Sequence, residues 1–558
     1  MHKSFQDDKS IIPVDSPKLN VKAPSSFLWG VATSSYQFEG GILNNDWNYF
    51  TTNESIKNRI SMITKQNRFY KGISQVTLEP AGHAVRMWEP EFYLRDFDNA
   101  SSLGLNAFRI SIEWARIQPE RNVWNEHVID NYKKMIGSMR EKKLTPIVTL
   151  NHLTLPLWIS TPPTHFKGKK FQKLAPHPIR DLPLGDPEQS DPYWKAMGGW
   201  ENTETVSMFA KFVERIVTEL KDKVDYWVTI NEPVATVIGG GYFAGIFPPG
   251  FFLDGKRASK VMHNLIEAHV KAYDVISSVD DIDADGDDIP KKVGFSHLMV
   301  AVKPVTRKTI MGLGIDNTEA AKRFSYFIND YFINAVTKGE EDINYLRTLE
   351  IHDKYSKDFL IHDQWKNKVD FIGLNYYRSA YVYHSMIVSI STASFIGGVP
   401  INDISNHNQP HGVLNDLGWE VYPEGLYDFI MDLHNKWQIP IFVTENGVAD
   451  RDDKLRAKFI ISHLRELKKG IADGAKVIGY LHWSLMDSYE WQEGYSSRSR
   501  FGLFSIDRQD KNYSRHVTNG AKALKRIIER SLQDNQVISE SALQSAMSEF
   551  GQLPEGGL

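Results

Sequence analysis

Eight short runs of aliphatic, β-branched and aromatic residues recur along the chain, and each is followed by a longer segment with helical spacing. The runs cover residues 27–35, 106–114, 145–152, 226–232, 293–300, 370–377, 441–447 and 477–485. Candidate helices between and after them include residues 125–141, 203–223, 320–338, 424–437 and 452–473. Alternating strands and helices favour a parallel sheet, and eight repeats close a barrel. The pattern therefore predicts an α/β fold, a single (β/α)8 TIM barrel.

Length and segment composition favour one barrel with long βα-loop insertions over two domains. The chain has 558 residues, which exceeds a usual single domain, but barrels of this type often extend through their loops. We expect a polar N-terminal extension at residues 1–24, the barrel at 25–530, and a C-terminal tail at 531–558 that is bound to the surface or disordered. Three irregular stretches in βα positions should form the sides or the cover of the active face, namely residues 51–80, 161–199 and 389–417.

Composition excludes several classes of function. A net charge of −4 and a pI near 6.5 give no basic field for nucleic acid and no cationic face for an anionic membrane. No stretch approaches about 18 consecutive apolar residues, so we expect no integral membrane association. The polar start lacks the features of a secretory signal, and the chain has no cysteine, which fits a reducing compartment. We therefore expect a cytoplasmic protein that acts on a small molecule, and a homo-oligomer stays open.

Two glutamates each close one of the eight runs. Glu232 lies in Asn-Glu-Pro, and Glu445 lies in Thr-Glu-Asn-Gly. Hydrolysis of a glycosidic bond uses two carboxyl groups, one as nucleophile and the other as acid and then base. Either glutamate alone could be an ordinary acidic residue, but two at strand ends favour catalysis. His152, Asn375 and Trp483 also fall at or near such ends, where the βα loops of a barrel build the active site.

Seven segments along the chain read FLWGVATSSYQFEG, NAFRISIEWARI, TLNHLTLPLW, TINEP, DFIGLNYY, VTENG and HWSLMDSYEWQEGY. In this order they resemble the family 1 glycoside hydrolases, the retaining β-glycosidases, over roughly residues 25–530. The resemblance is to β-glucosidases and β-galactosidases, and the insertion at 161–199 is similar to that of archaeal-type and plastid galactolipid-remodelling members. It implies a β-linked substrate and retention of the anomeric configuration.

The resemblance also implies roles for the two carboxyl groups and their neighbours. Glu445 would attack the anomeric carbon, while protonated Glu232 donates to the leaving oxygen and later deprotonates water, which needs carboxyl groups about 5 to 5.5 Å apart. The family pattern puts Arg109 and Tyr377 beside the nucleophile, and a nearby cation lowers a carboxylate pKa, which should keep Glu445 ionised. Arg109 could otherwise form a structural ion pair. Asn231 would hold the sugar 2-OH, although it could instead only orient the following turn.

Sugar binding is likewise implied by the resemblance. Polar groups from Gln, Glu and His suit vicinal hydroxyls, which both donate and accept hydrogen bonds, and a tryptophan offers a ring face. The residues concerned are Gln37, His152, Asn375, Trp483, Glu490 and Trp491. Without the resemblance, His152 and the two tryptophans would be interpreted as core residues. Glu490 should repel 6-phosphorylated sugars, and Glu232 favours O-glycosides over thioglucosides.

Departures from the family pattern leave the sugar preference open. Leu153 follows His152 where tryptophan is usual, so one polar contact to the sugar is missing or comes from elsewhere. Ser488 stands where asparagine is usual, and residues 496–500 lengthen the link beside Trp491.

No cofactor or metal is expected. The proposed chemistry needs none, and the chain has no Gly-rich phosphate loop between a strand and a helix. Residues 239–245 should instead form a loop on the leaving-group side. The acidic run at residues 280–290 lacks the ligand spacing and terminal glutamate of a calcium loop, so we interpret it as a solvated turn.

The leading hypothesis is a retaining exo-β-glycosidase that removes a terminal β-D-glucosyl or β-D-galactosyl residue from a small glycoside. A transglycosylase would use the same residues and pass the glycosyl group to an alcohol. A catalytically silent carbohydrate-binding barrel is a third possibility, although such proteins usually lose one catalytic carboxylate and this chain keeps both.

Overall fold

The computed structural model describes the barrel and most of its connections. The described residues are 27–54, 56–58, 60–61, 78–160, 196–251, 254–305, 307–308, 314–315, 318–343, 345, 359–384, 393–396 and 412–554. Residues 1–26 and most of the three irregular stretches lie outside them, so the expectations for the N-terminal extension and the insertions stay predictions.

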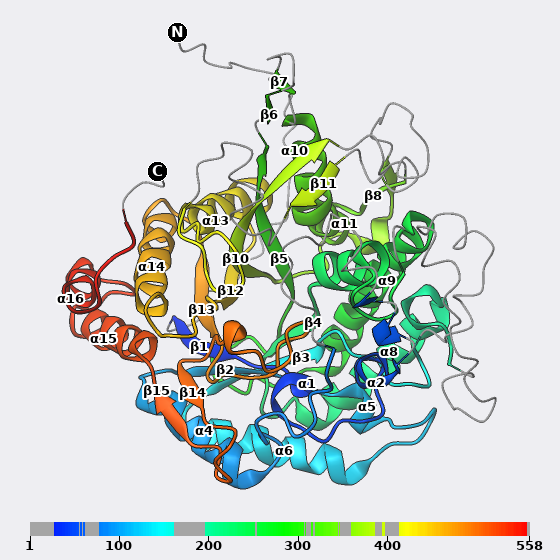
Figure 1. The fold of residues 1–558 in the computed structure, drawn as a ribbon. Coiled ribbons are helices and arrows are strands. Elements are labelled where there is room, and N and C mark those ends of the chain that lie inside the picture. Colours follow the sequence, from blue (N-terminus) through cyan, green and yellow to red (C-terminus); the bar gives the residue numbers. More distant parts are fainter. Residues whose placement is uncertain are drawn as a thin grey trace.

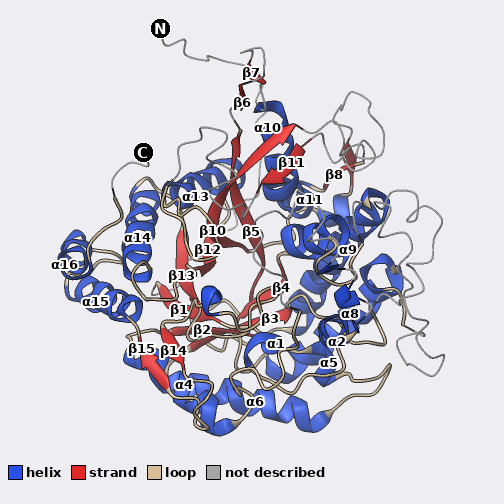
Figure 2. Cartoon of the chain, viewed as in Figure 1, coloured by secondary structure: helices blue, strands red, loops and turns tan. Residues whose placement is uncertain are grey.

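Eight parallel strands close into a barrel, which confirms the predicted (β/α)8 fold (Figures 1 and 2). In chain order they are β1 (Leu28–Ala32), β2 (Ala107–Ser111), β3 (Thr145–Asn151), β4 (Tyr226–Asn231), β5 (Lys292–Pro304), β10 (Phe371–His384), β12 (Ile441–Asn446) and β13 (Val477–Trp483). Neighbours in this order pair in parallel, and β13 pairs with β1 to close the sheet. Each of the eight predicted runs overlaps one of these strands.

Aromatic rings fill the barrel near the N-terminal ends of its strands. The rings of Tyr226, Phe371 and Phe442 pack together, with centroids 5.8, 6.1 and 6.4 Å apart. Tyr226 and Phe442 come from β4 and β12, which are not neighbours, so their contact crosses the interior. Strands packed on both faces read as continuous apolar runs, which explains the sequence pattern. The aromatic rings therefore fill the half of the barrel at the N-terminal strand ends, and the C-terminal strand ends are left for polar side chains.

Helices surround the barrel (Figure 2). Four of the predicted ones are α6 (Glu126–Glu141), α8 (Thr203–Leu220), α13 (Glu424–Trp437) and α14 (Arg456–Ala472), while residues 320–338 divide into α10 (Thr318–Ser325), the π-helical η6 (Tyr326–Asp330) and α11 (Tyr331–Lys338). The others include α1 (Ser35–Phe38), α2 (Asp46–Thr52), α4 (Pro90–Ser102), α5 (Trp114–Ile117), α9 (Gly255–Val279) and α15 (Asn519–Gln533). In α8, the Asn202 side chain caps the N-terminus by accepting from the Glu204 N–H, and an apolar stripe faces the core.

Several short strands lie outside the eight-stranded barrel. β11 (Ala393–Ile396) pairs antiparallel with the end of β10, and the described residues form three two-stranded sheets outside the barrel. These pair β6 (Arg307–Lys308) with β7 (Gly314–Ile315), β8 (Glu340–Asp342) with β9 (Phe359–Ile361), and β14 (Phe504–Ile506) with β15 (Arg515–Val517).

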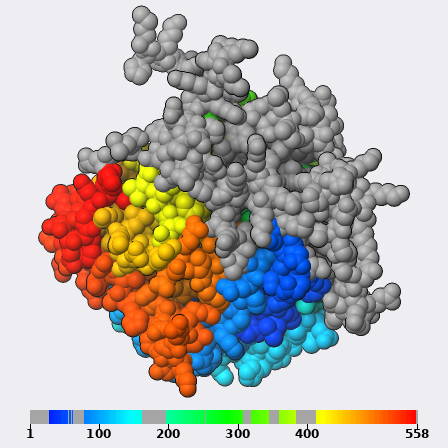
Figure 3. Space-filling view, viewed as in Figure 1, coloured from blue at the N-terminus to red at the C-terminus, as the bar shows by residue number. Residues whose placement is uncertain are grey.

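Two expectations need correction. Residues 239–244 are helical rather than a loop, because they form the second half of the π-helical η5 (Pro233–Ala244), which begins one residue after β4 and ends at the cap residue Gly245. The boundary at residue 530 cuts through α15, and the tail beyond it contains α16 (Glu540–Phe550), which packs against α14 and α15 on the surface (Figures 1 and 3). Ala542, Leu543 and Ala546 are buried in that contact, so this part of the tail is surface-bound and ordered by its apolar face.

Candidate active site

Glu232 lies directly after β4, at the C-terminal end of the barrel. Its backbone is left-handed, with φ of 49°, and its N–H donates to the carbonyl of Ser296 on β5 at 2.8 Å. The Oε1 atom accepts from Asn375 Nδ2 at 2.8 Å, and Oε2 accepts from the hydroxyl of Thr236 in the first turn of η5. The carboxyl group is therefore held from two sides by neutral donors.

Glu445 projects from β12 and is held by a cation and a phenol. Its Oε1 accepts from Arg109 Nη1 of β2 at 2.7 Å, and its Oε2 accepts from the Tyr377 hydroxyl of β10 at 2.7 Å. Arg109 is fully buried, and Glu445 is its only acidic ion-pair partner among the described residues. The structure thus brings together Glu445, the predicted nucleophile, and the two residues predicted beside it, Arg109 and Tyr377.

Two asparagines connect the carboxyl groups. Asn231 Oδ1 accepts from Arg109 Nη2 at 2.8 Å and from Asn375 Nδ2 at 3.2 Å, and Asn375 Nδ2 also donates to Glu232. A continuous set of hydrogen bonds therefore joins Glu232, Asn375, Asn231, Arg109 and Glu445. Four different strands or strand ends supply these side chains, so the closed barrel sets their geometry.

The two carboxyl groups experience different electrostatic surroundings. Burial and, after it, the negative charge of Glu445 raise the pKa of Glu232 to about 7, against the lowering effects of Thr236, Asn375 and Arg109. Burial also raises the pKa of Glu445, while Arg109 and Tyr377 lower it. The expected lowering by Arg109 is present, but the net direction is upward because burial outweighs it. Since a cation contacts only Glu445 directly, the pair favours a proton on Glu232.

His152, Trp483 and Trp491 lie side by side at the mouth of the barrel. The His152 ring stacks at 6.1 Å from each of the two tryptophan rings, with an interplanar angle of 19° in both cases. Its Nε2 lies 3.4 Å from Asn231 Nδ2, and its Nδ1 is buried without a partner among the described residues. Burial and the charge of Arg109 lower the pKa of His152 well below its usual range, so the ring is neutral. Because Asn231 Nδ2 can only donate, Nε2 accepts this contact and Nδ1 carries the proton, so Nδ1–H is the donor left for a hydroxyl.

Gln37 and Glu490 complete the predicted sugar-binding set. The Gln37 amide is already used within the protein, because Oε1 accepts from Ser34 Oγ at 2.7 Å and Nε2 donates to the Tyr489 carbonyl at 2.8 Å. Burial, Glu493 and the two catalytic candidates raise the pKa of Glu490 to about 8. A neutral carboxyl repels phosphate less than a carboxylate does, so the argument that Glu490 excludes 6-phosphorylated sugars loses force at neutral pH.

Sequence reasoning missed three threonines that orient the site. Thr236 contacts Glu232, Thr149 Oγ1 accepts from Arg109 Nε at 2.8 Å, and Thr444 Oγ1 donates to Asn375 Oδ1 at 2.7 Å. Thr149 and Thr444 lie on strands next to recognised residues, and Thr236 lies four residues after Glu232 in a helix. These spacings are the only signals in the sequence that could have indicated them.

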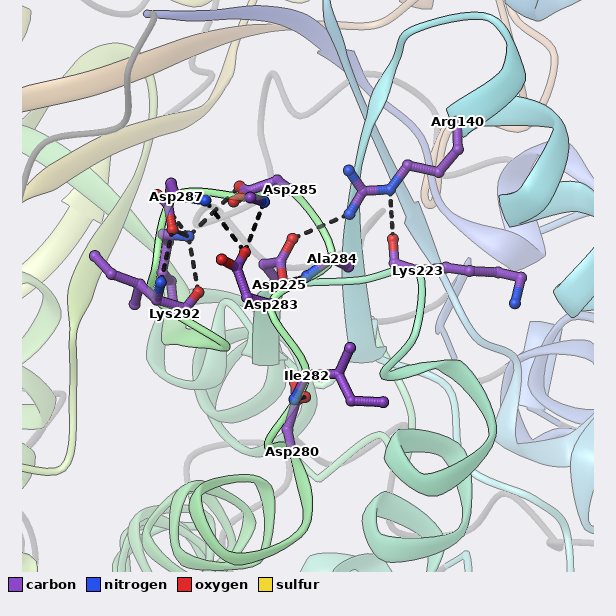
Figure 4. A network of polar contacts seen from close by, with 12 residues as sticks. Arg140, Lys223, Asp225, Asp280, Ile282, Asp283, Ala284, Asp285, Asp287 and Lys292 are labelled. Carbon is purple, nitrogen blue, oxygen red and sulfur yellow. Dashed lines mark hydrogen bonds and ion pairs between the residues drawn. The ribbon is translucent and has the colours of Figure 1, made fainter.

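The acidic run at residues 280–290 forms a turn on the other end of the barrel wall, where protein groups neutralise it (Figure 4). Asp283 accepts from three backbone N–H groups, and Lys292 pairs with Asp285 and Asp287 at 3.5 and 3.0 Å. Asp225 accepts from Arg140 at 3.0 Å. Asp225, Asp283 and Asp285 bring oxygens close enough together for a cation, and each of them already has a hydrogen-bond or ion-pair partner within the protein.

Comparison with known proteins identifies the family of the chain. The model of glycosyl hydrolase family 1 matches residues 20–170 and 193–532. The chain belongs to glycosyl hydrolase family 1. It is 31% identical over 537 residues to a β-galactosidase of Pyrococcus woesei, and the match covers 87% of this chain and 92% of that protein. It is 28% identical to β-glucosidase A of Thermotoga maritima, and this match covers 88% of this chain and 94% of that protein. The solved β-glycosidase of Pyrococcus horikoshii superposes with a TM-score of 0.68 at 28% identity over 96% of this chain and 99% of that one.

Membership makes this family 1 protein an O-glycosyl hydrolase of the β-glucosidase and β-galactosidase type. The match spans all eight barrel strands and every site residue named above. No helix among the described residues is long and apolar enough to span a membrane.

Proposed function

We propose that this family 1 glycosidase is a retaining exo-β-glycosidase that releases terminal β-D-glucosyl or β-D-galactosyl residues from small O-glycosides. The observation that carries the proposal is the contrast between its two central carboxyl groups. Glu445 is held by a cation and a phenol, whereas Glu232 is held by an amide and a hydroxyl. The first arrangement suits a nucleophile and the second suits an acid.

In the first step a Glu445 oxygen attacks the anomeric carbon as the bond to the leaving oxygen breaks. Arg109 and Tyr377 each hold one carboxylate oxygen, which orients the group and stabilises its charge before attack. The proton of Glu232 passes to the leaving oxygen. The negative charge of Glu445 supports that role, because it raises the pKa of Glu232 towards neutrality.

In the second step water attacks the glycosyl-enzyme and Glu232 accepts its proton. Glu445 is now esterified and uncharged, so one cause of the raised Glu232 pKa is absent and Glu232 becomes a base. One residue can thus serve as acid and base in turn. An alcohol in place of water would give transglycosylation through the same groups.

Asn231 is suited to bind the hydroxyl next to the anomeric carbon. Its oxygen is fixed by Arg109 and Asn375, which leaves its amide N–H groups towards His152 and the sugar space. A hydrogen bond there strengthens as positive charge develops on the sugar ring in the transition state. His152, Trp483 and Trp491 would present polar edges and ring faces to the rest of the sugar.

The choice of glucosyl or galactosyl substrates rests on the named relatives, one a β-galactosidase and one a β-glucosidase. A weakly acidic chain fits a small neutral substrate. The absence of cysteine supports a cytoplasmic location without requiring it.

The test replaces each carboxyl group and identifies the product formed with azide. Glu445→Gly should abolish hydrolysis of nitrophenyl β-glucoside and β-galactoside, and azide should restore turnover with an α-glycosyl azide as product, because azide then makes the only displacement. Glu232→Ala should instead give the β-glycosyl azide after two displacements. Glu466→Gln, a buried glutamate paired with Lys469 on α14, is the matched control and should keep wild-type activity. Full hydrolysis by Glu445→Gly would overturn the assignment.

A further inference from the structure

Three chain segments carry side chains at or beside the proposed sugar site, namely α1 and α2, which are close in sequence, and the turn after β3. α1 carries Gln37, the turn after β3 carries His152, and α2 carries Trp47, whose ring packs at 4.4 Å on Trp491. None of these segments belongs to the barrel sheet. Their relative positions therefore need a connection other than strand pairing.

Backbone pairing of Asn45 with Pro156 joins α2 to the turn after β3, and Glu113 connects both of these segments with α1. Glu113 lies just after β2, at the same end of the barrel as the catalytic candidates, and it is 1% exposed. Its Oε2 accepts from Ser35 Oγ at 2.9 Å, and the Thr154 hydroxyl lies 3.1 and 3.0 Å from its two oxygens. Asn45 Nδ2 lies 3.5 Å from Oε1. One carboxyl group thus receives a donor from each of the three segments.

Each donor lies within two residues of a side chain at the sugar site. Ser35 begins α1, two residues before Gln37, and its N–H is fixed by Ser111 Oγ at 2.7 Å. Thr154 follows His152 by two residues, and its N–H donates to the His152 carbonyl at 3.0 Å. Asn45 caps α2, two residues before Trp47. Displacement of any donor would move its neighbour at the site.

Glu113 is separate from the groups that react. Among the hydrogen bonds of the described residues, none joins it to Glu232 or Glu445. Arg116 is the cation near Glu113. It is held by Glu39 at 3.0 Å and by the carbonyl of Gly40, two residues that directly follow α1. A buried carboxyl with hydroxyl and amide donors and no role in the reaction needs another explanation for its position.

We infer that Glu113 is a positioning residue that sets the geometry of the sugar subsite by fixing α1, α2 and the turn after β3 together. The inference rests on the proposed function for the identity of that subsite. A side chain displaced by about 1 Å can cost about 100-fold in rate, so the effect on sugar recognition should be large although Glu113 contacts no substrate.

The test measures kcat and KM on a nitrophenyl β-glycoside and on its analogues that lack one ring hydroxyl each. In the wild type, removal of a hydroxyl that the subsite binds lowers kcat/KM. Glu113→Ala should lower kcat/KM on the parent substrate by about 10- to 100-fold and reduce the loss caused by removing that hydroxyl, because the subsite no longer holds it. Glu113→Gln keeps one acceptor oxygen and should restore part of the discrimination.

Two further variants separate positioning from folding. Thr154→Val removes one donor with nearly the same shape and should weaken discrimination less than Glu113→Ala. Asp96→Asn alters a buried carboxylate that pairs with Arg515 at 2.9 Å on the outer wall, and it should lower the melting temperature without changing the pattern across the deoxy substrates. If Glu113→Ala does not fold, Glu113→Gln and Thr154→Val carry the test.

Failure of this inference differs from failure of the proposed function. An active wild type whose deoxy-substrate pattern is unchanged in Glu113→Gln and Thr154→Val overturns the inference alone. If the wild type shows no turnover, calorimetry with D-glucono-1,5-lactone replaces the assay. Weaker lactone binding by the Glu113 variants then supports the inference, and equal binding, or no binding even to the wild type, overturns it.

Discussion

The proposed catalytic floor and the proposed sugar-binding rim of the candidate active site are built differently. The floor consists of Arg109, Asn231, Glu232, Asn375, Tyr377 and Glu445, which all lie on barrel strands or directly after them. The rim consists of Gln37, His152, Glu490 and Trp491, which lie on segments that leave the barrel. Strand pairing fixes the floor, whereas buried polar groups such as Glu113 fix the rim. Activity should therefore be most sensitive to changes of charge in the floor and to loss of the hydrogen bonds that hold the segments of the rim.

The largest effect is expected from Arg109→Met in the floor. The variant leaves Glu445 buried without its cation, so the pKa of Glu445 rises and less of it is ionised. We expect kcat to fall by about 100- to 1000-fold, as for loss of a preorganised electrostatic partner. The acid limb of the pH profile of kcat/KM should move to higher pH, because that limb reports ionisation of the nucleophile. An unmoved acid limb would separate Arg109 from the ionisation of Glu445.

Tyr377→Phe should act in the same direction with a smaller magnitude. It removes one donor to Glu445 and leaves the ion pair with Arg109 intact. A hydrogen bond to a charged group contributes about 1.5–3 kcal/mol, which corresponds to about 10- to 100-fold in kcat/KM. The measurement is the pH profile beside that of Tyr381→Phe, a tyrosine further along β10 that faces Glu420. Equal profiles for the two variants would argue against a role of the Tyr377 hydroxyl.

The floor was the more predictable region, and its strand origin explains why. Glu232 and Glu445 end apolar runs, Arg109 lies within one, and the C-terminal ends of parallel strands meet at one face. The sequence could not indicate Glu113, whose partners Ser35 and Thr154 are 78 and 41 residues away. It also could not indicate the upward pKa of Glu445, because burial is a property of the folded site. The ordered α16 was missed because three small or apolar residues on one face are a weak signal in a polar tail.

Thr236→Val tests the acid side of the floor. The Thr236 hydroxyl lowers the pKa of Glu232, which stands at about 7, so its removal should raise that pKa. The alkaline limb of the pH profile reports loss of the acid's proton and should move to higher pH. A neutral hydrogen bond contributes about 1 kcal/mol, so kcat/KM near neutrality should change by no more than about fivefold. A shift of the alkaline limb to lower pH would contradict the proposed direction.

The smallest catalytic effect is expected from Asp46→Asn, at the base of the rim, where stability rather than rate should change. Burial raises the pKa of Asp46 to about 8 from an ordinary value of 3.8, and its Oδ1 accepts from the Leu155 N–H at 2.9 Å, a bond that asparagine can keep. A carboxyl whose pKa is raised on folding binds its proton more tightly in the folded state. Its contribution to stability is therefore present below about pH 4 and is lost as pH rises towards 8.

The unfolding free energy of the wild type should fall across this window more steeply than that of Asp46→Asn, by roughly 1 kcal/mol per pH unit. Denaturant titrations between pH 5 and 8 measure the slopes, and Asp98→Asn, an exposed aspartate paired with Lys142, should leave the slope unchanged. Parallel curves for the wild type and Asp46→Asn would mean that Asp46 is ionised in the folded protein, and the predicted loss of stability with rising pH would then not come from Asp46.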